Sequence, residues 1–323
     1  SLCRSFSLPR PPAFTTRRLL QRMMSPLSSS PPPSWEPLRS QLSAHGQLHL
    51  LSPLPPAEAA GAYAAQLEQL NLSLLQKLFH ASTSLAPASG SVTPFEGVTR
   101  LDELADAGAA ERREGLSLIA QGKVAALLLA GGSGTRLGFD APKGCFNIGM
   151  PSGKSLFQYH AEKVLAVRQL AAAHEGIPLA KVSLPLLVMT SAANDEETRA
   201  FFAKHANFGL PEQQLHFFPQ GMLPAFDNKG RILRASHAEL SLSPNGNGGV
   251  YLSLLESGML DHLEAAGVTS VFQFGVDNVL CHVAEPTFIG FCSRSGAECG
   301  VKTIAKAHPH EKVGVLALVD GRP

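Results

Sequence analysis

One apolar run constrains the fold of this chain more than any other feature. Residues 124–130 read Val-Ala-Ala-Leu-Leu-Leu-Ala with no polar alternation, which is typical of a strand buried on both faces of a parallel sheet. Four glycines follow at once, at Gly131, Gly132, Gly134 and Gly138. The backbone there can turn tightly and approach a ligand where a Cβ would block it. The sequence therefore predicts a buried strand that ends in a ligand-binding loop.

The same loop carries two cations. Arg136 and Lys143 follow the first glycines, and two fixed positive charges beside exposed backbone N–H groups suit a polyphosphate. We therefore interpret residues 123–143 as a nucleotide site. A solvated loop cation is the alternative for Lys143, and a plain strand-to-helix turn is the alternative for the glycines.

Strands and helices alternate after this loop. Apolar runs predict three more strands, at 182–190, 215–218 and 271–276. Helices are expected from Ser155, from Asn194 as N-cap, and from Val250 to about residue 265. A hairpin at 225–233 turns at Asn-Lys-Gly. This alternation predicts βαβ units, and hence an α/β fold with a mainly parallel sheet.

Polar side chains stand where the predicted strands end. Gln220 follows the third strand and Asp277 the fourth, and open parallel sheets bind ligands beyond the carboxyl ends of their strands. The cluster Asn245-Gly246-Asn247-Gly248-Gly249 precedes a predicted helix, whose N-terminus can bind an anion or face a base or sugar. Alone, this cluster is better explained as a capped loop, and a turn cap is the alternative for Asp277. Together, these features favour a site.

The chain before the first strand has two parts. Residues 1–34 contain arginines, serines and prolines and no acidic residue, so we expect a disordered segment, either a transit peptide or an untranslated or read-through extension. Residues 35–121 are predicted to be a helical region, and one helical face carries Tyr63, Leu67, Leu70, Leu74 and Leu78. Residues 122–323 are the predicted catalytic domain. We expect a cytoplasmic protein, or organelle import if residues 1–34 are a transit peptide.

Composition limits the possible partners. The formal net charge is +1 and 16% of the residues are charged, so nucleic acid and anionic membranes are not expected partners. No apolar run reaches the ~18 residues of a spanning helix. The five cysteines are scattered without a CxxC pair, which favours reduced thiols. No third ligand completes the pairs His45/His49 and His308/His310, so zinc is not supported.

Spacing argues against two other nucleotide motifs. The segment from Gly149 to Ser155, GMPSGKS, is one residue short between its glycines for a P-loop and follows no buried strand. We expect a turn and a capping box of Ser155 and Gln158 there. In the segment GSGTRLG, which begins at Gly132, three residues separate the second and third glycines. The dinucleotide fingerprint of an oxidoreductase is therefore off by one.

Five motifs in order resemble one family. They are LLLAGGSGTRLGFDAPKG from Leu127, QGMLPA from Gln220, PNGNGG from Pro244, GVDN from Gly275 and FIGFC from Phe288. They closely resemble the eukaryotic UDP-N-acetylglucosamine pyrophosphorylases. The resemblance implies a doubly wound, Rossmann-like nucleotidyltransferase sheet of the GT-A-like kind, with an N-terminal helical extension. It also implies an enzyme that forms UDP-N-acetylglucosamine and pyrophosphate from UTP and N-acetylglucosamine 1-phosphate.

The resemblance also assigns roles to residues. It implies that the uridine of UTP lies against Leu129, Ala130, Gly131 and Gly132, with Gln220 and Gly246 also at the base and Asn247 at the sugar. Arg136 and Lys143 would hold the triphosphate. Asp277 would lie at the phosphates as a ligand for Mg²⁺, which prefers oxygen donors. These three residues are the expected catalytic group, and the sugar phosphate itself is the expected nucleophile.

The sequence departs from the family at three places. Ser133 stands where the family usually has Gln, and Asn245 where it more often has Asp. The chain also stops at Pro323, before the family's Asn-Ala-Gly-Asn-Ile-type sugar-binding segment, so we expect a fragment of a longer protein or a truncated form with impaired catalysis. The alternatives are a UDP-glucose or broad UDP-sugar pyrophosphorylase and a non-catalytic UTP-binding fragment. Oligomeric state stays open.

Overall fold

The described residues form two compact units. The structure, a computed structural model, describes residues 35–84, 90–95 and 97–321. Unit 1 combines Gly97–Gly221 with Asn245–Val313, and unit 2 combines the described residues before 97 with Met222–Pro244 and 314–321. The predicted transit peptide or extension, residues 1–34, lies outside the described residues. The domain boundaries drawn after residues 34 and 121 stay predictions.

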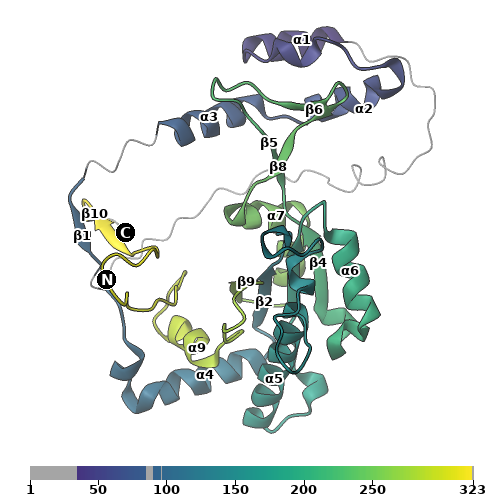
Figure 1. Ribbon diagram of the computed structural model, residues 1–323. Coiled ribbons are helices and arrows are strands. Elements are labelled where there is room, and N and C mark those ends of the chain that lie inside the picture. The colour runs from purple at the N-terminus through teal and green to yellow at the C-terminus, as the bar shows by residue number, and fades with distance from the viewer. Residues whose placement is uncertain (1–34, 85–89, 96, 322–323) are drawn as a thin grey trace. The chain divides into compact units, whose positions relative to one another are not determined.

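Unit 1 is built on a parallel four-stranded sheet in the order β4-β3-β2-β9 (Figure 1). The strands are β2 (Val124–Leu129), β3 (Leu186–Thr190), β4 (Leu215–Pro219) and β9 (Ser270–Gly275). Each predicted apolar run therefore contains a strand. The most apolar run, β2, lies between β3 and β9, as a strand without polar alternation should.

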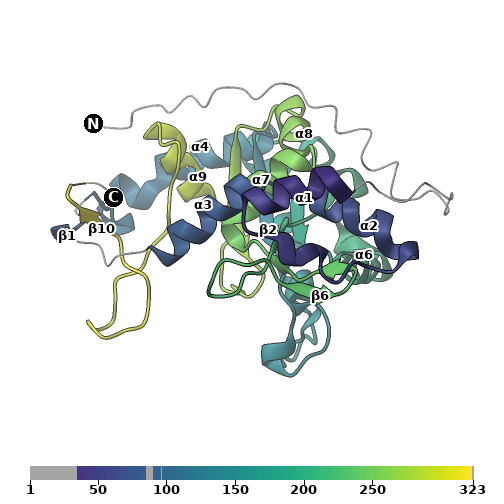
Figure 2. The same cartoon turned by 90° about the horizontal axis from the view of Figure 1, so that it is seen from above.

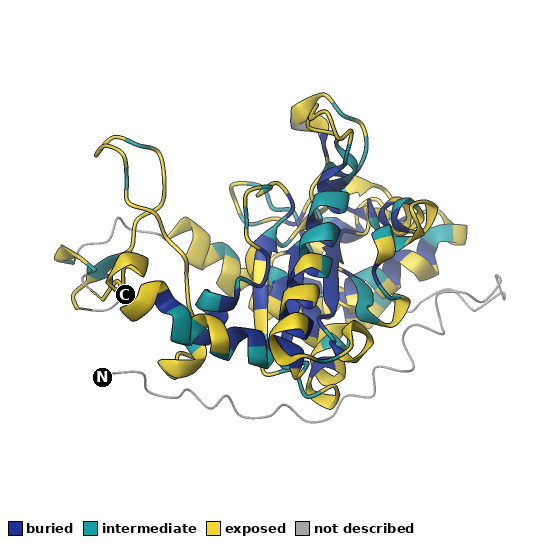
Figure 3. Cartoon of the chain, turned by 90° about the horizontal axis from the view of Figure 1, so that it is seen from below, coloured by how far each residue is buried: buried dark blue, intermediate teal, exposed yellow. Residues whose placement is uncertain are grey.

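Helices cover both faces of this sheet. Alternate residues of β2, such as Val124 and Ala126, pack against α4 (Ala109–Ala120), α5 (Leu156–Glu175), α6 (Asp195–Lys204) and α9 (Pro286–Arg294). Ala125 and Leu127 face α7 (Val250–Glu256) and α8 (Met259–Ala265) instead. The central strands β2 and β3 are buried, whereas the outer faces of the helices are exposed (Figure 3). The doubly wound α/β prediction is confirmed.

Two glycines bring α4 and α9 into close contact. These helices lie side by side (Figure 1). A Cβ at Gly115 would overlap the backbone of Pro286, and a Cβ at Gly290 would overlap the backbone of Glu111. The close packing fixes α9 against α4. Helix α4 leads into β2, and α9 follows the loop after β9. Among the described residues, no helix combines the length and the apolar character that a membrane crossing requires.

Some helix boundaries differ from those predicted. The helix expected from Val250 to about residue 265 is split at Gly258, whose φ of +73° is left-handed. The capping box at the start of α5 is half formed, because Ser155 Oγ accepts from Gln158 N at 3.2 Å whereas the Gln158 side chain donates to Glu162. A periodic pattern continues across such breaks, and it does not reveal which partner a side chain chooses.

Unit 2 packs three helices and short hairpin strands around its own core. Its helices are α1 (Trp35–Ala44), α2 (Ala57–Glu68) and α3 (Leu72–Thr83), and α1 lies beside α2 (Figure 2). Its strands pair as β1 (Val92–Pro94) with β10 (Ala317–Val319), β5 (Met222–Pro224) with β8 (Leu242–Pro244), and β6 (Arg234–Ser236) with β7 (Glu239–Leu240). Trp35 packs against a cluster that includes Leu42, Tyr63 and Ile232.

The predicted apolar face of unit 2 is only partly buried. Tyr63 and Leu67 are buried as expected, but Leu74 and Leu78 are exposed. The helix is interrupted between α2 and α3, and Asn71 caps the second helix by accepting from Leu74 N at 3.0 Å. Because the break rotates the helical pattern, Leu72 and Leu75 take the buried positions instead.

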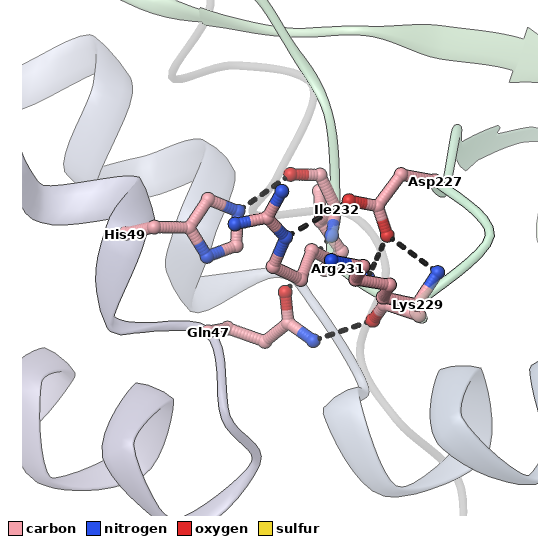
Figure 4. A network of polar contacts seen from close by, with 7 residues as sticks. Gln47, His49, Asp227, Lys229, Arg231 and Ile232 are labelled. Atoms are coloured by element: carbon pink, nitrogen blue, oxygen red, sulfur yellow. Dashed lines mark hydrogen bonds and ion pairs between the residues drawn. The ribbon is translucent and has the colours of Figure 1, made fainter.

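The predicted hairpin at 225–233 is confirmed and is joined to the helices by one glutamine (Figure 4). Asp227 N donates to Arg231 O at 2.9 Å, and Phe226 bridges Ile232. The buried Gln47 accepts from Ile232 N at 2.9 Å and donates to Gly230 O at 2.8 Å. Its side-chain amide thus makes the two bonds that a neighbouring strand would make.

Candidate active site

The order of the strands defines where a ligand would bind in unit 1. The chain runs from β2 outward to β3 and β4, then returns to the other side of β2 as β9. Sheets of this kind bind ligands where the strand order reverses, beyond the carboxyl ends of the strands. Leu129 pairs with Gly275 in the parallel register, and Val276 N donates to Leu129 O at 3.0 Å. The glycine loop after β2 and the loop that carries Asp277 therefore leave the sheet together.

Gly131 lies directly beneath the side chain of Gln220. A Cβ at Gly131 would overlap the Gln220 amide and lie 3.1 Å from Thr190 O. Gln220 N donates to Thr190 O at 2.8 Å, so the end of β4 is tied to the end of β3. The structure thus brings together two residues that the sequence analysis expected at the base. Among the described residues, the buried Gln220 amide makes no hydrogen bond, which leaves it able to bond a ligand.

Asn194 is a further residue at this edge, and the sequence analysis assigned it only a helix cap. It occupies the N-cap position of α6 but makes no side-chain cap bond. Instead its Nδ2 donates to Ala130 O at 3.0 Å and its Oδ1 accepts from Ser191 N at 2.7 Å. The side chain therefore joins the ends of β2 and β3. Its place directly after a predicted strand was the one available signal.

Lys143 and Asp277 meet at the same edge. Lys143 Nζ lies 3.2 Å from Asp277 Oδ2, although the two residues are far apart in the chain. Lys143 N also donates to Gly132 O at 3.2 Å, and the lysine Cε lies near the position of a Cβ at Gly132. The lysine side chain is 23% exposed and the aspartate side chain 67% exposed. Water screens such a pair, so its own contribution to stability is small.

A buried contact holds Lys143 in this position. Lys143 begins a short 3-10 helix, η7 (Lys143–Cys145). A Cβ on the next residue, Gly144, would overlap the ring of Phe157, which is fully buried on α5. Gly144 therefore lets the loop lie flat against α5. Burial, with a smaller effect of Glu197, raises the pKa of the Cys145 thiol to about 12, so this cysteine is not a nucleophile near neutral pH.

The structure describes only the backbone of Arg136, in the short helix η6 (Thr135–Leu137). Its side chain lies outside what the structure describes, so its expected contact with phosphate stays a prediction. The loop around it is closed by a bond from Gly134 N to Ala141 O at 2.9 Å and by a bridge between Ser133 and Pro142.

Gly246 and Asn247 lie on a segment that is tied to the residue after Gln220. Asn245 N donates to Gly221 O at 3.1 Å, and Gly221 N donates to Ser253 Oγ at 2.9 Å. Gly246 has a φ of +75°, and both Gly246 and Asn247 are exposed. Within the described part of the chain, no hydrogen bond or ion pair links either residue to Lys143 or Asp277.

The residues at this edge fit a magnesium ion that is held partly by substrate phosphates, rather than a metal ion held by protein ligands alone. Asp277 offers one exposed carboxylate at a strand end. In the described ranges, no three His, Cys, Asp or Glu side chains are placed to hold a metal ion together. Mg²⁺ is commonly held by one or two carboxylates together with substrate phosphates and water. A single carboxylate beside a candidate phosphate site meets that requirement.

A cavity of about 440 Å³ lies elsewhere, in unit 2, where Asp227, Arg231, Arg234 and His49 line it. Its polar groups already bond one another. Arg231 Nε lies 2.8 Å from Asp227 Oδ2, and His49 Nε2 lies 2.8 Å from Ile232 O (Figure 4). We place the candidate site at the strand ends of unit 1, where the order of the strands reverses and where Gly131 meets Gln220 and Lys143 meets Asp277.

Comparison with known proteins identifies one family. The family described as UTP–glucose-1-phosphate uridylyltransferase matches residues 78–323. UDP-N-acetylglucosamine diphosphorylase 1 of Arabidopsis thaliana is 47% identical over 62% of this chain and 40% of its own length. UDP-N-acetylglucosamine pyrophosphorylase of Saccharomyces cerevisiae is 42% identical over 65% of this chain and 43% of its own length. The matches thus span less than half of either relative.

A solved structure is also similar. The uridine diphosphate N-acetylglucosamine pyrophosphorylase of Trypanosoma brucei, crystallised in complex with an inhibitor, superposes with a TM-score of 0.74 at 34% identity. The superposition covers 92% of this chain and 61% of that chain. The similarity therefore includes most of this chain.

Proposed function

The chain belongs to the UTP–glucose-1-phosphate uridylyltransferase family, and from that premise we propose that it carries the nucleotide-binding part of a uridylyltransferase active site. The proposed reaction joins UTP and N-acetylglucosamine 1-phosphate to form UDP-N-acetylglucosamine and pyrophosphate. The names of the relatives at 42% and 47% identity support this choice of sugar. The observation that carries the proposal is the meeting of Gly131 with Gln220, and of Lys143 with Asp277, at one edge of the sheet.

In this proposal the uracil ring lies on the backbone from Leu129 to Gly132. The close approach of Gln220 to Gly131 supports this, because it places the Gln220 side-chain amide at the backbone on which the ring is proposed to lie. The Gln220 side-chain amide, which has no hydrogen-bond partner among the described residues, can donate to and accept from the edge of a base. Gly246 is proposed at the base and Asn247 at the sugar. Asn245, the residue before Gly246, bonds Gly221, the residue after Gln220, so this hydrogen bond brings the two segments together in space.

The transfer needs no nucleophile from the protein. An oxygen of the sugar phosphate forms a bond to the α-phosphorus of UTP, while the bond from that phosphorus to the bridging oxygen of the β-phosphate breaks. Pyrophosphate leaves with the electron pair. Both substrates are anions, so the tasks left to the protein are positioning and charge neutralisation. Lys143 supplies a positive charge that pairs with Asp277, its backbone N–H bonds Gly132 O, and Arg136 is proposed to supply a second charge.

Asp277 is proposed to hold Mg²⁺ together with the phosphates of UTP. When bound, the ion would offset negative charge on the phosphate oxygens. Lys143 Nζ lies 3.2 Å from Asp277 Oδ2. The pair therefore keeps both side chains at the proposed phosphate position, and the positive charge of Lys143 offsets the negative charge of Asp277 there.

Two alternatives are separated by one assay. The chain is mixed with UTP, Mg²⁺ and either N-acetylglucosamine 1-phosphate or glucose 1-phosphate, and pyrophosphate release is measured. We expect release with N-acetylglucosamine 1-phosphate to exceed release with glucose 1-phosphate. The reverse preference would establish the UDP-glucose alternative.

If no pyrophosphate is released, a binding measurement decides between the remaining possibilities. Titration calorimetry of UTP with Mg²⁺ into the same chain would then distinguish a non-catalytic UTP-binding fragment, which binds UTP, from a chain without a nucleotide site. This second alternative has a specific motive, because the matched region is 40% of the Arabidopsis protein and 43% of the yeast protein. Absence of both release and binding would refute the proposed function.

A further inference from the structure

Two side chains on one face of α5 bond the loop that carries Asp277. His160 and Lys163 are separated by three positions, so they project from the same face of the helix. His160 Nε2 donates to Val276 O at 2.8 Å. Lys163 Nζ donates to Cys281 O at 3.0 Å and also to Val279 O. The loop 276–281 is thus bonded to α5 on both sides of Asp277.

The histidine is fixed by packing as well as by its hydrogen bond. His160 is fully buried, and its ring lies edge-on to the ring of Phe274 in β9, with the centroids 5.1 Å apart. Its Nδ1 is buried and has no partner among the described residues. Burial lowers the pKa of His160. The ring is therefore neutral at neutral pH and donates one hydrogen bond, from Nε2 to the loop.

The lysine is an unusual choice for a structural contact. Lys163 is half-buried, and burial lowers the pKa of its ammonium group. Its partners are neutral carbonyls, and no carboxylate pairs with it in the described part of the chain. A partly buried ammonium group without a carboxylate costs folding free energy that a neutral side chain would not. Its charge lies behind the loop that presents Asp277, where a positive potential favours phosphate.

Backbone hydrogen bonds within the loop connect the segments before and after Asp277. Asn278 N donates to Gly275 O at 3.1 Å, and Cys281 N donates to Asn278 O at 3.1 Å. The carbonyls of Val276, Val279 and Cys281 point toward α5, while the carboxylate of Asp277 extends to Lys143. The direction of that carboxylate therefore depends on which way the carbonyls of the loop face.

We propose that His160 and Lys163 are positioning residues of the transfer site, which together hold loop 276–281 so that the carboxylate of Asp277 faces Lys143. This inference rests on the proposed function. It adds a layer of residues behind the phosphate position that touches neither substrate nor metal. Partners of metal-ligating groups commonly contribute about 10-fold to 100-fold to affinity or activity.

The test compares matched variants of each residue. Lys163→Met removes the ammonium group and keeps the length of the side chain, whereas Lys163→Arg retains donors that can reach the two carbonyls. His160→Leu removes the donor, whereas His160→Gln retains one. Lys154→Met is the control, because Lys154 lies just before the N-cap of the same helix and pairs with Glu162 at 2.6 Å instead of with the loop. Thermal unfolding of every variant establishes that it is folded.

The first measurement needs no turnover. Backbone amide hydrogen exchange is followed by mass spectrometry in peptides that cover 276–281 and, for comparison, 124–129. We expect Lys163→Met to speed exchange in the loop about 10-fold, to leave β2 unchanged, and to be reversed by Lys163→Arg. We likewise expect His160→Leu to speed exchange in the loop and His160→Gln to restore slow exchange. Unchanged loop exchange in both Lys163→Met and His160→Leu would overturn the inference.

The second measurement separates positioning from simple stabilisation. We expect Lys163→Met to lower kcat about 10-fold while the KM for UTP changes much less, and Lys163→Arg to restore kcat. A loosened loop with normal kcat would overturn the positioning role. If the unsubstituted chain has no turnover, that result bears on the proposed function, and the exchange data alone decide whether the two side chains hold the loop.

Discussion

Gly131 and Gly132 are neighbours in the chain, yet only one of them has no room for a side chain. A Cβ at Gly131 would overlap the Gln220 amide, whereas a Cβ at Gly132 would meet nothing closer than Lys143 Cε at 3.9 Å. We expect Gly131→Ala to displace Gln220, to destabilise unit 1 by about 1–3 kcal/mol, and to weaken UTP binding about 10-fold. Gly132→Ala should change stability by less than about 0.5 kcal/mol.

Thermal unfolding and UTP titration calorimetry of the two variants check this prediction. Equal loss of stability at both positions would contradict the close contact between Gly131 and Gln220.

Lys143 is the residue for which catalysis and stability should separate most clearly. Its pair with the largely exposed Asp277 contributes little to folding. Loss of a preorganised charge at the reacting phosphates typically lowers kcat about 100-fold or more. We therefore expect Lys143→Ala to lower turnover by about that factor while the free energy of unfolding changes by less than about 1 kcal/mol. Normal turnover with a large drop in melting temperature would refute the role assigned to Lys143.

At the scale of elements, one side chain in unit 2 replaces a strand. Gln47 is 7% exposed and bonds Ile232 N and Gly230 O across a large distance in sequence. Gln47→Ala would leave that donor and acceptor without partners in a buried place, so we expect unit 2 to lose about 1–3 kcal/mol. Gln69→Ala, an exposed glutamine at the end of α2, should cost less than about 0.5 kcal/mol.

Urea denaturation of the two glutamine variants provides the measurement. A similar midpoint for both would mean that water replaces the bonds of Gln47 at no cost.

Elements were predictable where the signal was local. The continuous apolar run that became β2 predicted both a strand and its burial, because only an interior strand of a parallel sheet has two apolar faces. The break between α2 and α3 was missed because Leu70, Leu74 and Leu78 continue a helical spacing across it. The split at Gly258 was missed for the same reason, since the pattern says nothing about one residue with left-handed backbone.

The site was predictable only in part. Local sequence marked the glycine loop and its cations, as well as Gln220 and Asp277 at the ends of predicted strands, and the resemblance supplied the roles of these residues. Neither indicated that Asn194 joins β2 to β3 or that His160 and Lys163 bond the Asp277 loop. These contacts join residues that are far apart in the chain, and their geometry follows from the strand order. Strand order depends on the packing of the whole sheet.

At the scale of the whole molecule, all the candidate site residues lie in unit 1. A ligand that binds only the folded state raises the free energy of unfolding by about 2.7 kcal/mol at a concentration 100 times its Kd. We expect UTP with Mg²⁺ to stabilise unit 1 in this way. The same concentration should stabilise Lys143→Ala much less, because the triphosphate loses a cation. Differential scanning calorimetry with and without UTP is the measurement, and an equal shift in both proteins would exclude Lys143 from the site.

The position of Trp35 decides which optical signals can follow such experiments. It is the single tryptophan of the sequence, and it packs against the core of unit 2. Its fluorescence emission therefore reports the surroundings of α1 and carries no direct signal from the sheet of unit 1. A nucleotide-induced stabilisation can be large and still leave the emission curve unchanged. The intrinsic fluorophore is suited to the Gln47 variants, whereas the nucleotide site needs a label of its own.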